Sequence, residues 1–202
     1  MEYIAHLSKD KKLKSILAQQ EPLVLKQRKN ICLRLCASIM SQQLSTKVAD
    51  VIFKRFLQLY DGAEPTPEQI AATPPDVLRS IGLSNAKAAY VLNVATFVQE
   101  HKLKDVVLKK LSNEEIIALL TQIKGIGQWT VEMLLMFTLG REDVFAADDY
   151  GIQVAMKKLY GLDDSNKKAF KENMLRLSQK WKPYRTYACM HLWRWKDAPK
   201  EA

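Results

Sequence analysis

Apolar residues recur along this chain at the three- and four-residue spacing of helix faces. One clean stripe after residue 30 predicts a helix, and its members are Ile31, Cys32, Leu35, Cys36, Ile39 and Met40. Further stripes over residues 48–59 and 88–98 predict two more helices, and residues 7–18 predict one short polar helix. Strand-like alternation is not sustained anywhere in the sequence, so the predicted fold is all-α.

Residue types that favour helix starts and core packing refine this pattern. Thr66, just before a proline, is expected to cap one helix, and Ser84 is expected to cap the next. Cys32 and Cys36 lie four residues apart on an apolar face, which favours core packing. With Cys189 they make three cysteines without a framework spacing, which is typical of free thiols in a reducing interior.

The most distinctive stretch is 120–150, LTQIKGIGQWTVEMLLMFTLGREDVFAADDY. An apolar helical face ends near Leu120, and Gly125 and Gly127 interrupt the pattern before a strongly apolar helix over 130–139. Two glycines one residue apart allow positive φ and a close approach of backbone amides to another surface. Successive N–H groups there, with the positive end of the next helix, suit an anion such as DNA phosphate. Taken alone, such a pair is also typical of a plain helical turn.

The charge balance agrees with a polyanionic partner. Lys and Arg number 31 against 22 Asp and Glu, a net charge of +9, although charge alone supports only solubility or non-specific binding. No signal peptide and no apolar run of bilayer length is evident, so we expect a cytoplasmic, nucleoid-associated protein without a membrane partner. The sequence has no four-cysteine cluster and no HExxH or paired CxxC pattern, so neither an iron–sulfur cluster nor zinc is expected.

The pieces IKGIGQWT and DVFAADDYGIQ resemble the helix–hairpin–helix and aspartate signature of the base-excision DNA glycosylase superfamily, and within it the 3-methyladenine DNA glycosylase II family. The resemblance runs from Leu13 to Trp195. It implies two helical lobes with the active site in the cleft between them. Residues 30–139 would form the central lobe, and residues 1–29 with 140–202 a discontinuous second lobe. Larger relatives carry an N-terminal β domain, which this compact form is expected to lack.

The acid pair carries the chemistry that the resemblance implies. Asp149 matches the family's catalytic carboxylate, and Asp148 is expected to be the structural acid, so that one of the pair caps the following helix while the other acts in catalysis. Cleavage of an N-glycosidic bond builds positive charge on the sugar, and a fixed carboxylate stabilises that charge. For either acid, the alternative interpretation is an N-cap of the following helix and nothing more.

The resemblance also implies a base pocket formed by Trp129, Tyr150 and Trp193, with Met133 where the family has another tyrosine. N3- and N7-alkylated purines are cationic, and aromatic faces attract cations. Relatives that also cleave the DNA backbone have a nucleophilic lysine at the position of Trp129, so we expect an intact abasic product. Core packing is the alternative interpretation of Trp129.

DNA contacts are implied at two places. The hairpin would contribute Lys124, where the family often has proline, and Gly125, Ile126, Gly127 and Thr130. In the polar turn after the first apolar stripe, Gln43 or Leu44 would fill the gap left by a flipped base. A plain inter-helix turn is the alternative there. By resemblance, the backbone carbonyls of Thr121, Ile123 and Gly125 would also hold a Na⁺ or K⁺ ion, and no cofactor is required.

The sequence therefore predicts a monofunctional glycosylase that acts as a monomer on double-stranded DNA in base excision repair and removes 3-methyladenine or 7-methylguanine. Two alternatives remain open. One is a glycosylase for the deaminated bases uracil and hypoxanthine. The other is a non-catalytic helix–hairpin–helix DNA-binding module, which would need the hairpin and the charge but not Asp149 together with the aromatic pocket.

Overall fold

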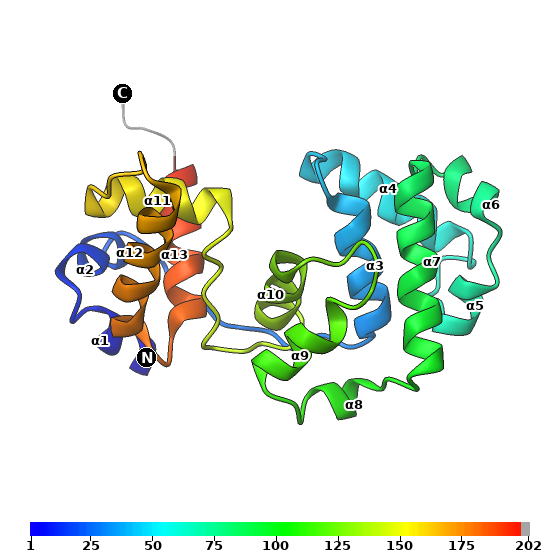
Figure 1. Ribbon diagram of the computed structural model, residues 1–202, viewed down its shortest axis with the longest axis horizontal. Coiled ribbons are helices and arrows are strands. Elements are labelled where there is room, and N and C mark those ends of the chain that lie inside the picture. The colour runs from blue at the N-terminus through cyan, green and yellow to red at the C-terminus, as the bar shows by residue number, and fades with distance from the viewer. Residues whose placement is uncertain (199–202) are drawn as a thin grey trace. The chain divides into compact units, whose positions relative to one another are not determined.

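The computed structural model describes residues 1–198, and over that range it contains helices and no strand, which confirms the predicted fold class (Figure 1). In chain order its helices are α1 (Glu2–Leu7), α2 (Lys11–Leu17), α3 (Ile31–Ser41), α4 (Thr46–Gln58), α5 (Pro67–Ala71), α6 (Pro75–Ser80), α7 (Asn85–Glu100), α8 (Asp105–Leu108), α9 (Asn113–Leu120), α10 (Gln128–Phe137), α11 (Tyr150–Tyr160), α12 (Lys167–Ser178), the 3₁₀ helix η1 (Gln179–Trp181) and α13 (Arg185–Asp197). Within the described range, every helix is too short or too polar to cross a bilayer.

The chain divides into two compact units. The continuous unit is Arg28–Leu134. The split unit combines Met1–Gln27 with the chain from Leu135 onward, so it is built from two segments that the continuous unit separates in sequence. Helix α10 begins in the continuous unit and ends in the split unit.

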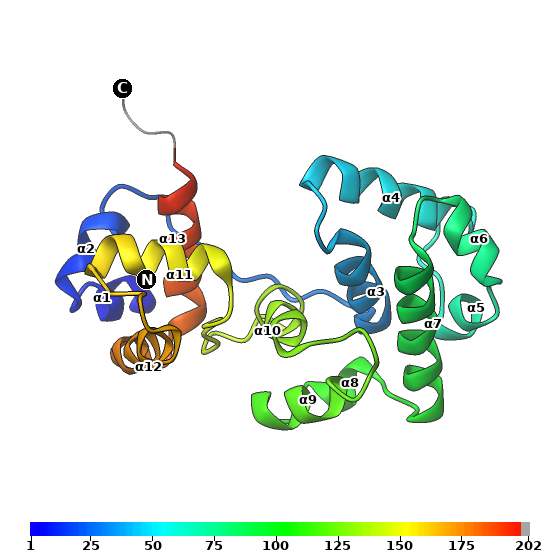
Figure 2. The same ribbon diagram turned by 45° about the horizontal axis from the view of Figure 1, so that its top comes forward.

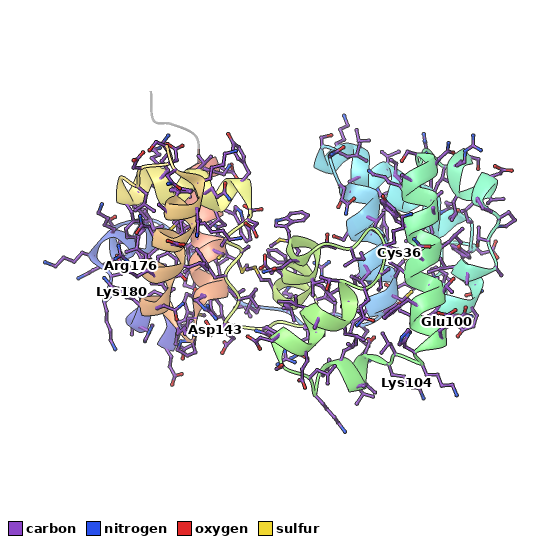
Figure 3. The ribbon with its side chains drawn as sticks, in the orientation of Figure 1. Cys36, Glu100, Lys104, Asp143, Arg176 and Lys180 are labelled. Atoms are coloured by element: carbon purple, nitrogen blue, oxygen red, sulfur yellow. The ribbon has the colours of Figure 1, made fainter. Side chains whose placement is uncertain are left out.

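Helix α3 lies at the centre of the continuous unit. All six residues of its predicted apolar stripe are buried, and α4 and α7 pack against it. Both ribbon views draw α3 beside α7 (Figure 2). Cys36 lies on α3 (Figure 3) with its Sγ 3.9 Å from the carbonyl oxygen of Val91 on α7. Cys32, Cys36 and Cys189 are buried free thiols, so the prediction of core packing for Cys32 and Cys36 is confirmed.

The caps predicted for α5 and α7 are both present. The hydroxyl of Thr66 accepts the N–H of Gln69 at 3.3 Å, and the Gln69 side chain accepts the N–H of Thr66 at 2.8 Å, which completes a capping box. The hydroxyl of Ser84 accepts the N–H of Lys87 at 3.3 Å. These bonds fix the starts of two helices that pack together.

Asp10 divides the N-terminal segment of the split unit into two helices. Its Oδ1 accepts the N–H groups of Lys12 and Leu13 and caps α2, while its Oδ2 accepts from Tyr160 and from the buried Trp181. The prediction of one helix over residues 7–18 is therefore wrong. The cap and the two distant donors favour a break before α2, and helical periodicity alone cannot reveal them.

The aromatic ring of Tyr3 joins the N-terminal segment to α13. It stacks on Tyr187 at a centroid distance of 4.0 Å, and its hydroxyl accepts the N–H of Leu23 at 2.6 Å. The same hydroxyl lies 3.4 Å from Nε2 of His191, whose Nδ1 lies 2.8 Å from the Gln20 side-chain oxygen. Burial, with a smaller contribution from a nearby arginine, lowers the pKa of His191 to about 4, so the buried ring is neutral at physiological pH.

Candidate functional site

Asp149 is the N-cap residue of α11. Its backbone is extended, with φ −74° and ψ 123°, and its Oδ1 accepts the N–H of Ile152 at 2.9 Å. The prediction that Asp148 is the structural, capping acid is therefore wrong. The cap falls on the residue immediately before the first helical one, and that residue is Asp149. The helix thus holds the carboxylate of Asp149 at its positive end.

Asp148 forms an ion pair with α12 instead. Both of its carboxylate oxygens lie close to Nζ of Lys171, at 2.6 Å and 2.7 Å. Both side chains are almost half exposed, so the pair contributes only about 0–1 kcal/mol to stability. Neighbouring acids therefore have separate environments, one at a helix end and one beside a lysine.

Trp193 on α13 makes a second contact with the catalytic candidate. Its indole Nε1–H donates to Oδ1 of Asp149 at 2.7 Å. The ring of Phe137 lies on another side of the indole, with centroids 5.9 Å apart and planes inclined by 36°. The structure therefore brings together two of the predicted site residues, Asp149 and Trp193, in direct contact.

The loop of residues 140–149 is fastened to the start of α13 by a buried hydroxyl. The side chain of Thr186 is fully buried; its Oγ1 donates to the carbonyl of Arg141 at 2.6 Å and accepts the N–H of Val144 at 3.1 Å. Sequence reasoning missed Thr186, because its partner lies 42 positions away and a lone threonine gives no local signal of such a contact.

An ion pair makes a second connection between the same loop and helix. The guanidinium of Arg185 contacts both carboxylate oxygens of Asp143, at 2.5 Å and 3.0 Å; Asp143 is labelled in Figure 3. Two parallel bonds of this kind fix orientation as well as distance. Helix α13 therefore carries Trp193 and also anchors the loop that leads to Asp149.

Tyr150 follows the acid pair as the first residue of α11, and its side chain is 80% exposed. It borders a hollow of about 620 Å³ on the split unit, together with Asp148, Phe170 and Lys171. An exposed ring at this place is accessible to a ligand.

In the hairpin between α9 and α10, Gly125 has a positive φ of 104°. A Cβ at this position would lie 2.3 Å from Cγ of Tyr90, so glycine is required for packing as well as for conformation. The side chain of Asn93 donates to the carbonyl of Lys124 at 3.2 Å and holds the same turn. Gly127 does not take a positive φ, so only the first of the two glycines uses this conformational freedom. A Cβ on Gly127 would meet no atom within 4 Å.

Apolar side chains anchor the hairpin beneath its surface. Ile123 and Ile126 are buried, and the N–H of Ile126 donates to the carbonyl of Ile123 at 3.0 Å. Thr130 is also buried, whereas Lys124 is exposed. The side chains of Ile126 and Thr130 therefore face the core, and the N–H of Ile126 is already bonded within the turn, so a contact from this pair to DNA would come from the main-chain N–H of Thr130.

Trp129 and Met133 lie one helical turn apart on α10. Trp129 is 38% exposed and Met133 is half-buried. The core-packing alternative therefore describes Trp129 only in part, because more than a third of this large ring is accessible.

The turn between α3 and α4 presents both wedge candidates at the surface. Gln43 is exposed with φ +59°, and Leu44 is 37% exposed. Nζ of Lys87 donates to the carbonyls of Met40 and Gln42, at 3.0 Å and 2.7 Å, and closes the end of α3. Partial burial lowers the pKa of Lys87. Sequence reasoning missed this lysine, since nothing in its own neighbourhood points to a helix end 45 residues away.

The predicted site residues fall into two sets. The split unit carries Asp148, Asp149, Tyr150 and Trp193, and the continuous unit carries Gln43, Leu44, the hairpin residues, Trp129 and Met133. Within residues 1–198, no group of three or more His, Cys, Asp or Glu side chains is arranged to hold a metal ion.

Comparison with protein families identifies the chain. The profile of the HhH-GPD superfamily of base excision DNA repair proteins matches residues 36–183. The chain belongs to this superfamily. A putative DNA-3-methyladenine glycosylase of Bacillus subtilis is 37% identical to this HhH-GPD protein over 179 residues, which cover 86% of the chain and 61% of the relative. DNA-3-methyladenine glycosylase 1 of Schizosaccharomyces pombe is 35% identical over 190 residues, covering 91% of the chain and 80% of the relative.

Solved structures agree with this assignment to the HhH-GPD superfamily. The S. pombe 3-methyladenine DNA glycosylase Mag1, in complex with abasic DNA, superimposes with a TM-score of 0.85 at 34% identity over the whole of both chains. A DNA-3-methyladenine glycosidase of Bacillus halodurans superimposes with a TM-score of 0.83 at 35% identity, covering 96% of this chain and 88% of the other.

Proposed function

We propose that this HhH-GPD protein is a monofunctional DNA glycosylase that removes alkylated purines from double-stranded DNA. The observation that carries the proposal is the carboxylate of Asp149, which is held at the start of α11 and in contact with the indole N–H of Trp193. The relatives named DNA-3-methyladenine glycosylases support the choice of substrate class.

The carboxylate supplies the electrostatic part of the reaction. When the C1′–N bond breaks, its electron pair leaves with the base and positive charge develops on the sugar. The negative charge of Asp149 stabilises that cation, and water then adds to C1′ and releases a proton. A non-catalytic DNA-binding module has no need of a carboxylate fixed by both a helix end and an aromatic N–H donor.

The aromatic residues favour a cationic base. The accessible rings of Tyr150, Trp193 and Trp129 attract a positively charged alkylpurine by about 0.5–2 kcal/mol per contact. 3-Methyladenine and 7-methylguanine are cationic in DNA and leave as neutral bases, so they need no protonation. A neutral base such as uracil needs its leaving group stabilised as well.

The absence of a lyase step is part of the proposal. At the position where bifunctional relatives carry a nucleophilic lysine, this chain has Trp129, whose indole cannot form a Schiff base with the sugar. Hydrolysis at C1′ would therefore leave an intact abasic strand.

Two surfaces of the continuous unit are assigned to DNA. The exposed Lys124 and the main-chain N–H groups that follow Gly127 at the start of α10 suit a backbone phosphate. At the turn after α3, Gln43 or Leu44 would enter the duplex and offset part of the unstacking cost of a few kcal/mol. The chain has 31 basic and 22 acidic residues, and this net positive charge supports binding of DNA at both surfaces.

The carbonyls of Thr121, Ile123 and Gly125 are candidate ligands for a monovalent cation. They alternate through the loop that joins α9 to α10, and neutral oxygen donors suit Na⁺ or K⁺. The Ile123 carbonyl already accepts the N–H of Ile126 at 3.0 Å and has a second lone pair for an ion. A cation held there would add positive charge beside a bound phosphate.

The decisive experiment is single-turnover base release from duplexes that carry 3-methyladenine, 7-methylguanine, hypoxanthine or uracil at one position. We expect the two cationic bases to leave well ahead of the neutral ones. Fastest release of uracil would instead establish the deaminated-base glycosylase. Tight duplex binding with no release of any of the four bases would establish the DNA-binding module.

A further inference from the structure

We propose that Trp193 is a positioning residue for Asp149. Its indole N–H holds the carboxylate in the orientation used for catalysis, and Gly151 is the residue that makes this contact sterically possible. The inference rests on the proposed glycosylase function and adds the device that aligns its central group.

Two donors from different helices meet at one oxygen of Asp149. The N–H of Ile152 on α11 lies 2.9 Å from Oδ1, and Nε1 of Trp193 on α13 lies 2.7 Å from the same atom. The cap bond alone would permit rocking about the side-chain torsions of the aspartate. A second, short, charge-assisted bond from another helix restricts that motion.

Gly151 leaves the space that the indole occupies. A Cβ at position 151 would lie 2.9 Å from Cδ1 and 3.0 Å from Nε1 of Trp193, and 3.0 Å from Oδ1 of Asp149. Any other residue would therefore push on both partners of the hydrogen bond. Glycine is a poor helix former compared with alanine, and this close approach accounts for its presence in the first turn of α11.

The indole ring also packs against a second aromatic ring. Phe137 packs against Trp193 at a centroid distance of 5.9 Å. The loop before Asp149 is itself anchored to α13 through Thr186. Donor and acceptor are thus both fixed relative to one helix, which is the arrangement that precise alignment of a charged group requires.

One side chain then has two tasks. The edge of the Trp193 indole aligns the carboxylate, while the partly exposed ring is the part that the proposed function assigns to the base. The electrostatic benefit of a carboxylate depends on its place relative to the developing charge on the sugar, so loss of the N–H donor should slow bond cleavage without weakening the hold on DNA.

The first test is Trp193→Phe, which keeps an aromatic face and removes the donor. We expect single-turnover release of 3-methyladenine and of 7-methylguanine to slow by the same factor, about ten- to a hundredfold, the effect of one hydrogen bond to a charged group. Affinity for undamaged duplex should not change. Trp195→Phe on the same helix, where the ring lies under Nζ of Lys158 at 4.7 Å, is the matched control and should keep the wild-type rate.

A base-dependent loss in Trp193→Phe would mean that stacking alone was affected and would overturn the proposal. An unchanged or faster rate would do the same, because it would show that the donor is neutral or that it weakens the effective charge of the carboxylate.

The second test leaves the indole in place. Gly151→Ala must displace the indole at some cost in strain, which the gain in helix propensity offsets in part, so its unfolding midpoint should fall only slightly while release slows about tenfold or more. The double variant with Trp193→Phe should be little slower than the slower single variant, because both changes break the same bond. Fully additive losses, or a wild-type rate in Gly151→Ala, would contradict the assignment.

A third measurement needs no activity. The protein has four tryptophans, and Trp193→Phe identifies the Trp193 indole N–H resonance by its loss. That resonance should move upfield in Asp149→Asn, while the other three stay in place. If it does not respond, the hydrogen bond is absent in solution and the proposal fails. If it responds but wild type releases no base, the contact stands and the proposed function is what fails.

Discussion

The ring of Tyr90 occupies the space that a side chain at position 125 would need. A Cβ on Gly125 would lie 2.3 Å from Cγ of that ring, whereas a Cβ on Gly127 would meet no protein atom within 4 Å. The two glycines of the hairpin therefore have different roles. Gly125 is needed by the fold, and Gly127 leaves an open backbone surface.

This difference gives a matched pair of variants. Gly127→Ala should keep the wild-type unfolding midpoint and weaken binding to damaged and undamaged duplex alike, by about tenfold, because a methyl group would obstruct a phosphate at the hairpin amides. Gly125→Ala should instead lower stability by about 1–3 kcal/mol. Titrations at several salt concentrations, with thermal melts, check both. A Gly127→Ala protein that lost only its preference for the lesion would place the phosphate contact elsewhere.

Asp149→Asn should retain the fold, since asparagine caps helices as well as aspartate, and should retain duplex affinity. Base release should fall by at least about a hundredfold, because the charge that faces the sugar cation is gone. Asp148→Asn removes only the partly exposed pair with Lys171 and should change stability by less than about 1 kcal/mol. Single-turnover rates decide the matter, and near-normal release by Asp149→Asn would refute its catalytic role.

The chemical form of the product follows from Trp129. Because an indole offers no amine to the sugar, strands treated with the protein should stay uncut until alkali cleaves the abasic site. Borohydride added during the reaction should trap no covalent protein–DNA adduct, as seen on a denaturing gel. Efficient trapping would reveal an unrecognised amine nucleophile and end the monofunctional assignment.

Thr186→Val is nearly isosteric but removes the hydroxyl that bridges Arg141 and Val144. A buried N–H and a buried carbonyl would lose their partner, so the unfolding free energy should fall by about 1–3 kcal/mol. Thr186→Ser keeps the hydroxyl and serves as the control, with a smaller loss. Chemical denaturation measures both. Equal losses in the two variants would indicate that the methyl group, rather than the bridge, carries the stability.

His191 should make the protein sensitive to mild acid. Its pKa is lowered to about 4 by burial, so the unfolded chain, with an ordinary histidine pKa of about 6.5, takes up the proton first as the pH falls. The stabilisation that the neutral, buried His191 ring gives to the fold is complete above pH ~6.5. It is lost between pH ~6.5 and ~4, at up to about 1.4 kcal/mol per pH unit. The free energy of unfolding, measured by chemical denaturation across this pH range, should vary less with pH in His191→Gln than in wild type.

The matched control for this pH dependence is His101→Gln, at an exposed position. It should leave the difference between neutral and acidic stability as in wild type. If His191→Gln loses stability on acidification as steeply as wild type, other groups account for the acid sensitivity.

How much of the fold could be predicted depended on how local its causes are. The α3 stripe and the caps at Thr66 and Ser84 are set by residues three or four positions apart. Periodicity predicted the stripe correctly, and residue type predicted the caps. The break at Asp10 was not predictable, because two of its determinants, Tyr160 and Trp181, lie 150 or more positions away.

The candidate site shows the same division. The family resemblance pointed to Asp149 and Trp193, but it did not show that Trp193 donates a hydrogen bond to Asp149 across 44 positions. The choice of Asp148 as the capping acid failed because a pair of adjacent acids does not reveal which of them precedes the first helical residue. Nothing in the sequence pointed to Gly151, because the need for glycine there comes from Trp193, which α13 places against it.

The connectivity of the split unit has a consequence for the order of folding. Met1–Gln27 must wait until the chain has been synthesised as far as His191 before α13 supplies the partners of Tyr3 and Gln20. The continuous unit has all its contacts within one uninterrupted stretch, and short-range contacts form fastest. On the ribosome the continuous unit, which contains the hairpin, would therefore fold first, and the split unit, which carries Asp149, would fold last. A nascent chain stalled before α13 would fold the hairpin that we assign to DNA while it still lacks Trp193, the donor proposed to align its carboxylate.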